Sequence, residues 1–237
     1  MGELVLMQDL KVIYEDNHIL IVEKTPNIPS QGDKTGDVDM LSLCKDYIKV
    51  KYSKPGNVYL GLVHRLDRPV GGVMVFAKTS KAASRLSNQV REKVFKKQYL
   101  AVVDGKFKSN KGSLEDYLYK DERNNISKVV SKDKKNAKKA SLDYEVIFYD
   151  EVKDLTLVRI NLHTGRHHQI RVQLSNFGHS IFGDQKYGTR GKCKQIALWA
   201  YCLTIEHPVT KKLMTFKDLP ESIGTWSILR KFDSSNL

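Results

Sequence analysis

The sequence predicts an α+β fold with a mixed, mostly antiparallel central sheet and flanking helices. Segments rich in β-branched and aromatic residues outnumber segments with helical periodicity. Most of these strand-like segments follow one another directly, separated by turn residues and not by helices. Direct succession favours antiparallel pairing over a doubly wound parallel sheet, which needs crossover helices. The chain of 237 residues is long enough to bury a core, and we expect a single domain over residues 1–237.

The first half of the chain mixes strands and helices. "KVIYEDNHILIVEK" (11–24) predicts a hairpin, because two β-rich runs flank an Asp-Asn turn, and "DMLSLCKDYIKV" (39–50) has apolar residues at helical spacing. "GVMVFAK" (72–78) predicts a short buried strand, and "TSKAASRLSNQVREKVFKK" (79–97) predicts an amphipathic helix. "QYLAVVDG" (98–105) predicts a strand that ends in a turn. The inward positions of the second helix are Ala82, Leu86, Val90 and Val94.

The second half is richer in strands. "SLDYEVIFYD" (141–150) and "DLTLVRINLHT" (154–164) flank a turn and predict an antiparallel pair. "RHHQIRVQLSNFG" (166–178) predicts a helix that ends at Gly178. Its expected inward residues are Ile170, Leu174 and Phe177. "IALWAYCLTI" (196–205) and "KKLMTFK" (211–217) predict a further strand pair.

Residues 106–140 differ from the rest in composition, because they are polar and lysine-rich with few large apolar side chains. We expect an exposed excursion from the fold, in the form of a hairpin. Two interpretations stay open for it. It is either a solvated surface loop or an arm that contacts phosphates, since any loop in so basic a chain carries lysines.

The charge balance points to an anionic partner. Lysine and arginine total 40 against 27 acidic residues, a formal charge of +13. Such self-repulsion is most readily offset by nucleic acid, or otherwise by an anionic membrane surface. We expect no membrane partner, because no apolar run approaches the ~18 residues of a spanning helix. The three cysteines, Cys44, Cys193 and Cys202, lack the spacing of a disulfide framework, which fits a reducing cytoplasm.

Cofactor and metal motifs are absent from the sequence. "GDKTGD" and "GDQKYG" contain glycines, but neither has the spacing of a phosphate-binding loop, and no dinucleotide fingerprint follows a strand. His163 and His167 have the spacing of a helical zinc pair, but Thr164 and Gly165 interrupt the helix between them. We therefore expect neither cofactor nor metal.

Two charged segments are candidates for chemistry. In "HRLDRP" (64–69), Asp67 lies between two arginines on a loop after a strand, because Pro69 cannot donate to a sheet ladder. It is either a turn-capping aspartate or a carboxylate held ready by an arginine. In "TGRHHQIR" (164–171), Arg166 is expected at the start of a helix, where free N–H groups suit an anion. The alternative is a basic helix face in solvent.

Four segments in this order resemble the RluA-type family of pseudouridine synthases. They are "HRLDRPVGGVMVFAKT", "KKQYLAVVDG", "TGRHHQIRVQLSNFGHSIFGDQKYG" and "ALWAYCLTIEHPVTKKLMTF". The resemblance runs from about Val12 to Pro220. It implies the pseudouridine synthase fold with a basic catalytic cleft, and an enzyme that isomerises uridine in RNA to pseudouridine without a cofactor. Relatives often follow the aspartate with Thr-Ser-Gly, whereas this chain has Arg68-Pro69-Val70-Gly71-Gly72, so local contacts to the target strand are expected to differ.

The resemblance also implies site residues. Asp67 matches the catalytic aspartate, Tyr99 the active-site tyrosine that stacks on uracil, and Arg166 the basic partner of the aspartate. Contacts with RNA are expected from Arg65, Arg68, His168, Gln169 and Arg171. Arg65 matches an arginine that fills the gap left by the extruded base. Asp67, Tyr99 and Arg166 are expected to converge in one cleft.

The expected substrate is ribosomal or transfer RNA, and the expected protein is a cytoplasmic monomer. The catalytic pattern begins by about Val12, so we expect no small N-terminal RNA-binding domain. A non-catalytic RNA-binding protein that keeps the fold is the alternative.

Overall fold

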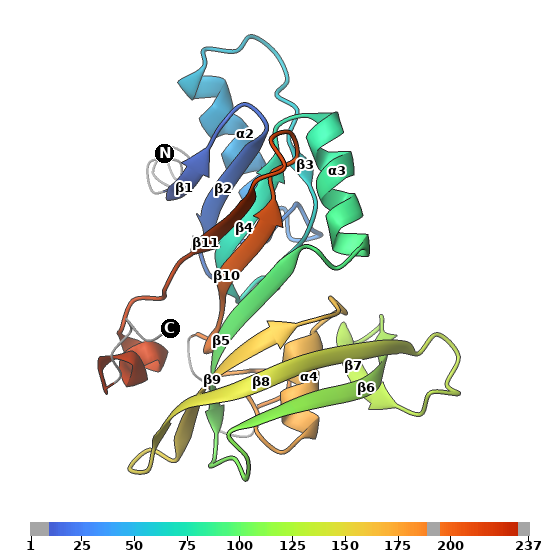
Figure 1. Cartoon of the computed structure of the whole chain (residues 1–237), viewed down its shortest axis with the longest axis vertical. Coiled ribbons are helices and arrows are strands. Elements are labelled where there is room, and N and C mark those ends of the chain that lie inside the picture. Colours follow the sequence, from blue (N-terminus) through green and yellow to red (C-terminus); the bar gives the residue numbers. More distant parts are fainter. Residues whose placement is uncertain (1–9, 189–194, 232–237) are drawn as a thin grey trace. The chain divides into compact units, whose positions relative to one another are not determined.

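The computed structural model describes residues 10–188 and 195–231, and within them the chain forms two compact units. The first unit comprises Met1–Lys96 and Ala200–Leu219, and the second comprises Lys97–Trp199 and Pro220–Leu237. Each unit is therefore built from two separate stretches of the chain (Figure 1). Cys193 lies outside the described residues, and Cys44 and Cys202 are buried free thiols.

The first unit is a sheet with two helices. Its strands neighbour one another in the order β1, β2, β4, β10, with β3 paired to β4 and β11 paired to β10. The strand bounds are Val12–Glu15 (β1), Ile19–Lys24 (β2), Gly61–Leu62 (β3), Gly71–Ala77 (β4), Leu198–Glu206 (β10) and Leu213–Lys217 (β11). The helices are α2 (Met40–Lys51) and α3 (Ser80–Arg91).

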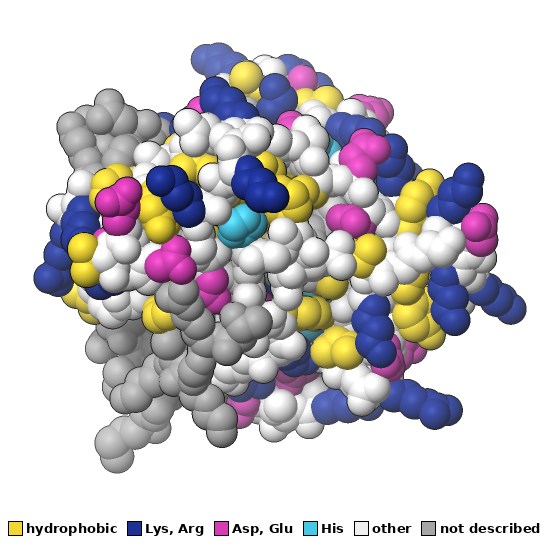
Figure 2. Space-filling model, turned by 90° about the horizontal axis from the view of Figure 1, so that it is seen from below, with side chains coloured by type: hydrophobic (Ala, Val, Ile, Leu, Met, Phe, Trp, Pro, Cys, Tyr) yellow, Lys and Arg dark blue, Asp and Glu magenta, His cyan; other side chains and the backbone are white. Residues whose placement is uncertain are grey.

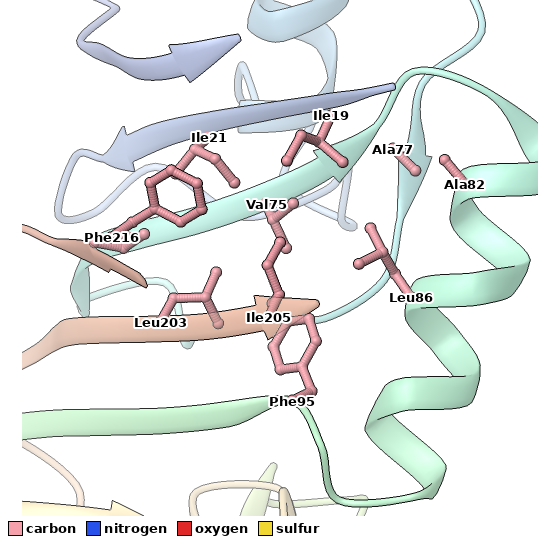
Figure 3. Close-up of a cluster of buried hydrophobic side chains, with 11 residues drawn as sticks. Ile19, Ile21, Val75, Ala77, Ala82, Leu86, Phe95, Leu203, Ile205 and Phe216 are labelled. Atoms are coloured by element: carbon pink, nitrogen blue, oxygen red, sulfur yellow. The ribbon is translucent and has the colours of Figure 1, made fainter. Parts of the chain in front are cut away.

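The core of the first unit lies between this sheet and α3. All seven residues of β4 are buried, as expected for a central strand between β2 and β10. Figure 3 shows Ala82 and Leu86 of α3 directed towards the apolar side chains of the sheet. The cluster consists of Ile19, Ile21, Val73, Val75, Ala77, Ala82, Leu86, Phe95, Leu203, Ile205 and Phe216.

The second unit is an antiparallel sheet covered by a short helix. Its strands neighbour one another in the order β5, β9, β8, β6, β7. The bounds are Lys96–Asp104 (β5), Lys111–Asp121 (β6), Ile126–Val130 (β7), Lys138–Asp150 (β8) and Leu155–Leu162 (β9). Helix α4 (Gln169–Asn176) packs on β6 and β7 through Val172, and a 3-10 helix, η1, spans Gly224–Lys231.

The predicted fold class, mixed and mostly antiparallel with flanking helices, is confirmed, but two helices are shorter than predicted. Helix α3 ends at Arg91, because Lys93 adopts a left-handed conformation (φ 59°) and β5 begins at Lys96. Val90 and Val94, predicted to face inward, are each 37% exposed. Helix α4 begins at Gln169 and not at Arg166. Phe177, after its last turn, is 43% exposed, so that inward prediction is also wrong.

The lysine-rich segment 106–140 is regular structure over most of its length. It contains β6, β7 and the first residues of β8, joined by the turn at 122–125 and the loop at 131–137. None of the helices in the described parts of the chain is both long and apolar enough to cross a membrane.

Candidate active site

Asp67 lies on the loop between β3 and β4 in the first unit, and the backbone of this loop is fixed by neighbours. The carbonyl of Asp67 accepts a hydrogen bond from the amide of Val70 at 2.9 Å, which closes a tight turn. On the other side, the hydroxyl of Ser30 donates to the carbonyl of Leu66 (2.8 Å) and accepts from its amide (3.1 Å). Asp67 therefore lies between Leu66, which is held by Ser30, and Val70, which closes the turn.

Lys24, the last residue of β2, is fully buried beneath the same loop. Its ammonium group donates to the carbonyls of Thr25 (3.1 Å), Arg68 (2.9 Å) and Val70 (2.7 Å). Burial lowers the pKa of Lys24 to about 7, opposed by the negative charge of Asp67 and assisted by the positive charge of Arg68. Lys24 thus ties the turn that follows Asp67 to the end of β2 and interacts electrostatically with the candidate carboxylate.

Arg68 anchors the loop to the segment that precedes α2. Its guanidinium group pairs with Asp37 and, at 3.6 Å, with Asp33, and its Nε donates to the carbonyl of Asn27 at 3.1 Å. The amide of Asn27 returns a hydrogen bond to the carbonyl of Arg68 at 2.8 Å. Arg65, by contrast, is exposed.

Tyr99 lies on β5 in the second unit and is only 7% exposed. It pairs with Ile160 of β9, and Lys97 shares its face of the strand two residues earlier. Burial lowers the pKa of Lys97. A Cβ at Gly165 would lie 3.2 Å from the Nζ of Lys97, so this ammonium packs against the turn that leads to Arg166.

Arg166 is held at the edge of β8 by the segment that continues β9. The amides of His163 and Thr164 donate to the carbonyl of Ser141 at 3.2 and 3.3 Å, and the Thr164 hydroxyl accepts from the Ser141 amide at 2.9 Å. The Nε of Arg166 then donates to the carbonyl of Lys139 at 3.0 Å. The side chain of Arg166 is exposed and precedes α4 by three residues.

Gln169 fixes the turn that carries Arg166. Its side-chain oxygen accepts from the Thr164 hydroxyl (2.7 Å) and from the Arg166 amide (3.0 Å). Its side-chain nitrogen donates to the carbonyl of Ser141 (3.1 Å) and to Gln173 (2.9 Å). A buried amide with all of these partners is rigid, so Gln169 fixes the position of the Arg166 backbone.

His168 and Arg171 are also buried in the second unit. Nδ1 of His168 lies 2.9 Å from the hydroxyl of Tyr187, and burial together with the charge of Arg171 lowers the pKa of His168 to about 2. Arg171 forms a bidentate ion pair with Asp184, with both N–O distances 2.7 Å. Contact between these groups and RNA would require the internal partners to be released.

The predicted site residues thus fall in both units. Tyr99 and Arg166 belong to the second unit, and Asp67 belongs to the first, so their convergence in one cleft stays a prediction. The sequence analysis did not single out Lys24 or Lys97. The available signal was a lysine at the end of a largely apolar strand, "ILIVEK", and one that shares the strand face of Tyr99.

Comparisons with known proteins agree with one another. A family model described as RNA pseudouridylate synthase matches residues 18–176, a range that includes Asp67, Tyr99 and Arg166. A Bacillus subtilis protein named uncharacterized RNA pseudouridine synthase YlyB is 33% identical over 227 residues, which cover 91% of this chain and 71% of that protein. Ribosomal large subunit pseudouridine synthase C of Buchnera aphidicola is 35% identical over 178 residues, covering 75% and 54% of the two chains.

A solved structure supports the fold. Human RNA pseudouridylate synthase domain containing 4 matches with a TM-score of 0.77 and 21% identity, covering 93% of each chain.

Proposed function

Because this chain belongs to the RluA-type family of RNA pseudouridine synthases, we propose that it converts specific uridines of structured RNA to pseudouridine with Asp67 as the catalytic carboxylate. In the proposed reaction the bond between N1 of uracil and the sugar breaks and the base rotates. A bond between carbon 5 and the sugar then forms. Carbon 5 loses a proton and N1 gains one, so atoms and electrons balance and no redox cofactor is needed.

Each of the four proposed site residues has a separate chemical role. Asp67 acts on the sugar or base, either as nucleophile or as the base that removes a sugar proton. Tyr99 provides an aromatic platform for the flipped uracil, and its hydroxyl serves the proton transfer at carbon 5. Arg166 is the expected cationic partner of Asp67. Arg65, which is exposed, fills the position vacated by the extruded base.

One observation carries the assignment of Asp67. The loop is tethered at Leu66, Arg68 and Val70, the residues immediately around the aspartate. A carboxylate that must meet a flipped nucleotide in one geometry benefits from such preorganisation. A turn-capping aspartate would not need two separate anchoring side chains, Ser30 and Lys24, on its loop.

The other residues expected to bind RNA act mainly through the loops they hold. Arg68 fixes the Asp67 loop, and Gln169 fixes the turn of Arg166. His168 and Arg171 hold α4 against the segment around Asp184 and Tyr187. We propose ribosomal RNA before transfer RNA, because one relative is named for the large ribosomal subunit. We also propose a monomer that works in the cytoplasm.

The test is the substitution Asp67→Asn. It keeps the size of the side chain and removes the negative charge, so we expect pseudouridine formation to fall roughly 1,000-fold or more, as for a group worth about 4 kcal/mol in the transition state. RNA binding should persist. Asp46→Asn, at an exposed position of α2, is the matched control and should keep full activity.

The measurement is release of tritium from carbon-5-labelled uridine in ribosomal and transfer RNA transcripts. Undiminished release by Asp67→Asn would refute the assignment of this residue. Salt-sensitive RNA binding by the wild type without tritium release from any transcript would favour the non-catalytic alternative.

A further inference from the structure

The sheet of the second unit has one face packed on α4 and one face that α4 does not cover. Leu118, Val129 and Ala140 belong to the face that packs with Val172 of α4. Successive strand residues alternate between faces, so Tyr117 and Tyr119 of β6 lie on the opposite face. Both rings are partly exposed.

Lysines surround these two rings. Tyr117 pairs with Lys139 of β8, and Tyr119 pairs with Lys128 of β7. The ammonium group of Lys134, from the loop at 131–137, lies 5.6 Å from the centre of the Tyr119 ring. We call this group of five residues the Tyr-Lys face: Tyr117, Tyr119, Lys128, Lys134 and Lys139.

Lysines outnumber acidic residues around the Tyr-Lys face, although Glu115 and Asp121 lie on the same face of β6. Residues 126–139 contain six lysines and one aspartate. Lys128 and Lys139 form ion pairs with Asp121 (3.7 Å) and Glu115 (3.0 Å), but both lysines are more than half exposed. Exposed ion pairs of this kind contribute little free energy, so these lysines can leave their acidic partners and bind RNA phosphates. In the view of Figure 2, basic side chains project from the surface with acidic ones between them.

The Tyr-Lys face lies on the side of the sheet away from Tyr99, because the register Tyr99–Ile160, Ile160–Tyr144 and Tyr144–Gly112 places Tyr99 on the face of Leu118. It meets the candidate site residues of its own unit through the backbone of Lys139. The carbonyl of Lys139 accepts the hydrogen bond from Nε of Arg166, and Lys139 is the cross-strand neighbour of Tyr117. The two tyrosines are two residues apart on one strand, which separates their Cα atoms by roughly 7 Å. This spacing suits two successive unpaired nucleotides whose bases stack on separate rings.

We propose that the Tyr-Lys face binds a single-stranded segment of the substrate RNA outside the candidate active site, with bases stacked on Tyr117 and Tyr119 and phosphates held by the surrounding lysines. The inference rests on the proposed function, which supplies the RNA. Single-stranded RNA is favoured over a duplex because stacking on tyrosine requires an unpaired base. The present contact of Lys134 with Tyr119 is an exposed cation–π interaction, which is weaker than stacking of a base.

The experiment measures binding of a fluorescein-labelled octauridylate to the full chain by anisotropy at 100 mM salt. Tyr117→Thr combined with Tyr119→Thr removes both rings but keeps strand propensity. We expect this variant to bind roughly tenfold or more weakly, the effect of losing stacking for one base or two. Tyr117→Phe combined with Tyr119→Phe keeps the rings and should bind within about twofold of the wild type.

Tyr149 provides a matched control. It is also a tyrosine of this sheet with a lysine over its ring, Lys106 at 5.2 Å. Since Tyr149 lies ten residues along β8 from Lys139, Tyr149→Thr should leave binding unchanged. A base-paired RNA of equal phosphate number should bind the wild type and the double threonine variant alike.

Photo-crosslinking of the wild type with 4-thiouridine in the oligonucleotide gives a readout that needs no variant. We expect crosslinks at Tyr117 or Tyr119. Crosslinks confined to other parts of the chain, or double threonine and wild-type proteins that bind equally, would overturn the inference. If the wild type forms pseudouridine but the double threonine variant binds RNA unchanged, the inference about the Tyr-Lys face fails and the proposed function stands. Ring-dependent binding without pseudouridine formation would instead overturn the proposed function.

Discussion

At the scale of single residues, Lys24 links the stability of the first unit to the loop of Asp67. Its ammonium group has three N–H bonds and three carbonyl acceptors, those of Thr25, Arg68 and Val70. A neutral amine has only two N–H bonds, so deprotonation leaves one of these carbonyls unserved. Because burial lowers the pKa of Lys24 to about 7, this change falls near neutral pH.

The first prediction follows from the sign of this shift. Unfolded lysine titrates at its ordinary pKa of 10.5, so between pH 7 and 10 the native state binds one proton fewer than the unfolded state. The free energy of unfolding of the wild type should therefore rise with pH relative to Lys24→Met, by up to about 1.4 kcal/mol per pH unit. Below pH 7 the difference between the two proteins should level off.

Urea unfolding at intervals from pH 6 to 9.5 measures this difference. Lys49→Met removes an exposed lysine of α2 and is the control, for which no such slope is expected. A difference between wild type and Lys24→Met that does not vary with pH would contradict the lowered pKa of Lys24.

What the sequence reveals about these residues depends on whether their chemistry is local. The chemistry around Asp67 left a turn cap and a catalytic group equally open, and the resemblance to a family tipped the choice. The partners of Arg68 could not be foreseen, because Asp33 and Asp37 are some thirty residues away in the chain. The burial of Lys24 is not predictable from the sequence, since a lysine at a strand end usually reaches water.

At the scale of elements, the turn before α4 shows why the ends of a helix are harder to predict from sequence than its existence. The helical pattern from Arg166 to Phe177 predicted one continuous helix. In the structure His168 is left-handed (φ 52°), so the helix starts at Gln169, three residues after Arg166. Before the helix, the amides of His163 and Thr164 hydrogen-bond to Ser141 of β8. This departure frees Arg166 from the helix. No propensity argument predicts it, because it depends on the hydrogen bonds of Gln169.

A second prediction concerns Gln169. Gln169→Leu removes both hydrogen bonds that its oxygen accepts, those from Thr164 and from the Arg166 amide. With each bond worth about 1 kcal/mol, we expect kcat for pseudouridine formation to fall roughly tenfold to a hundredfold. The affinity for RNA should change far less, because Arg166 remains present.

Gln169→Glu separates positioning from general damage to the fold. The glutamate can still accept from Thr164 and from the Arg166 amide but cannot donate to Ser141 or Gln173. Its kcat should lie between those of the wild type and Gln169→Leu. Full activity in Gln169→Leu would show that the turn keeps its geometry without this side chain.

At the scale of the whole molecule, the division into two units is hidden from the sequence. The chain crosses from the first unit to the second after Lys96, the first residue of β5, and returns after Trp199, within β10. Both crossings fall inside strands, where the composition carries no linker signal. The antiparallel fold class was predictable because it depends on local strand patterns, whereas the units depend on which distant strands pair.

The interleaved chain leads to the last prediction. The first stretch of the first unit, residues 1–96, lacks β10 and β11 and with them Leu203, Ile205 and Phe216 of the core. Each buried side chain of this size contributes about 1.5–3 kcal/mol, so the combined loss is comparable to the whole stability of a typical domain. A fragment of residues 1–96 should therefore show no cooperative thermal transition by circular dichroism.

The matched polypeptide joins residues 1–96 to residues 198–219 through a Gly-Ser linker and so restores both missing strands. We expect it to unfold cooperatively, since it then contains every member of the core cluster of the first unit. Cooperative unfolding of residues 1–96 alone would show that β2, β4 and α3 suffice for a core. Failure of the joined polypeptide would instead show that the first unit needs the second in order to fold.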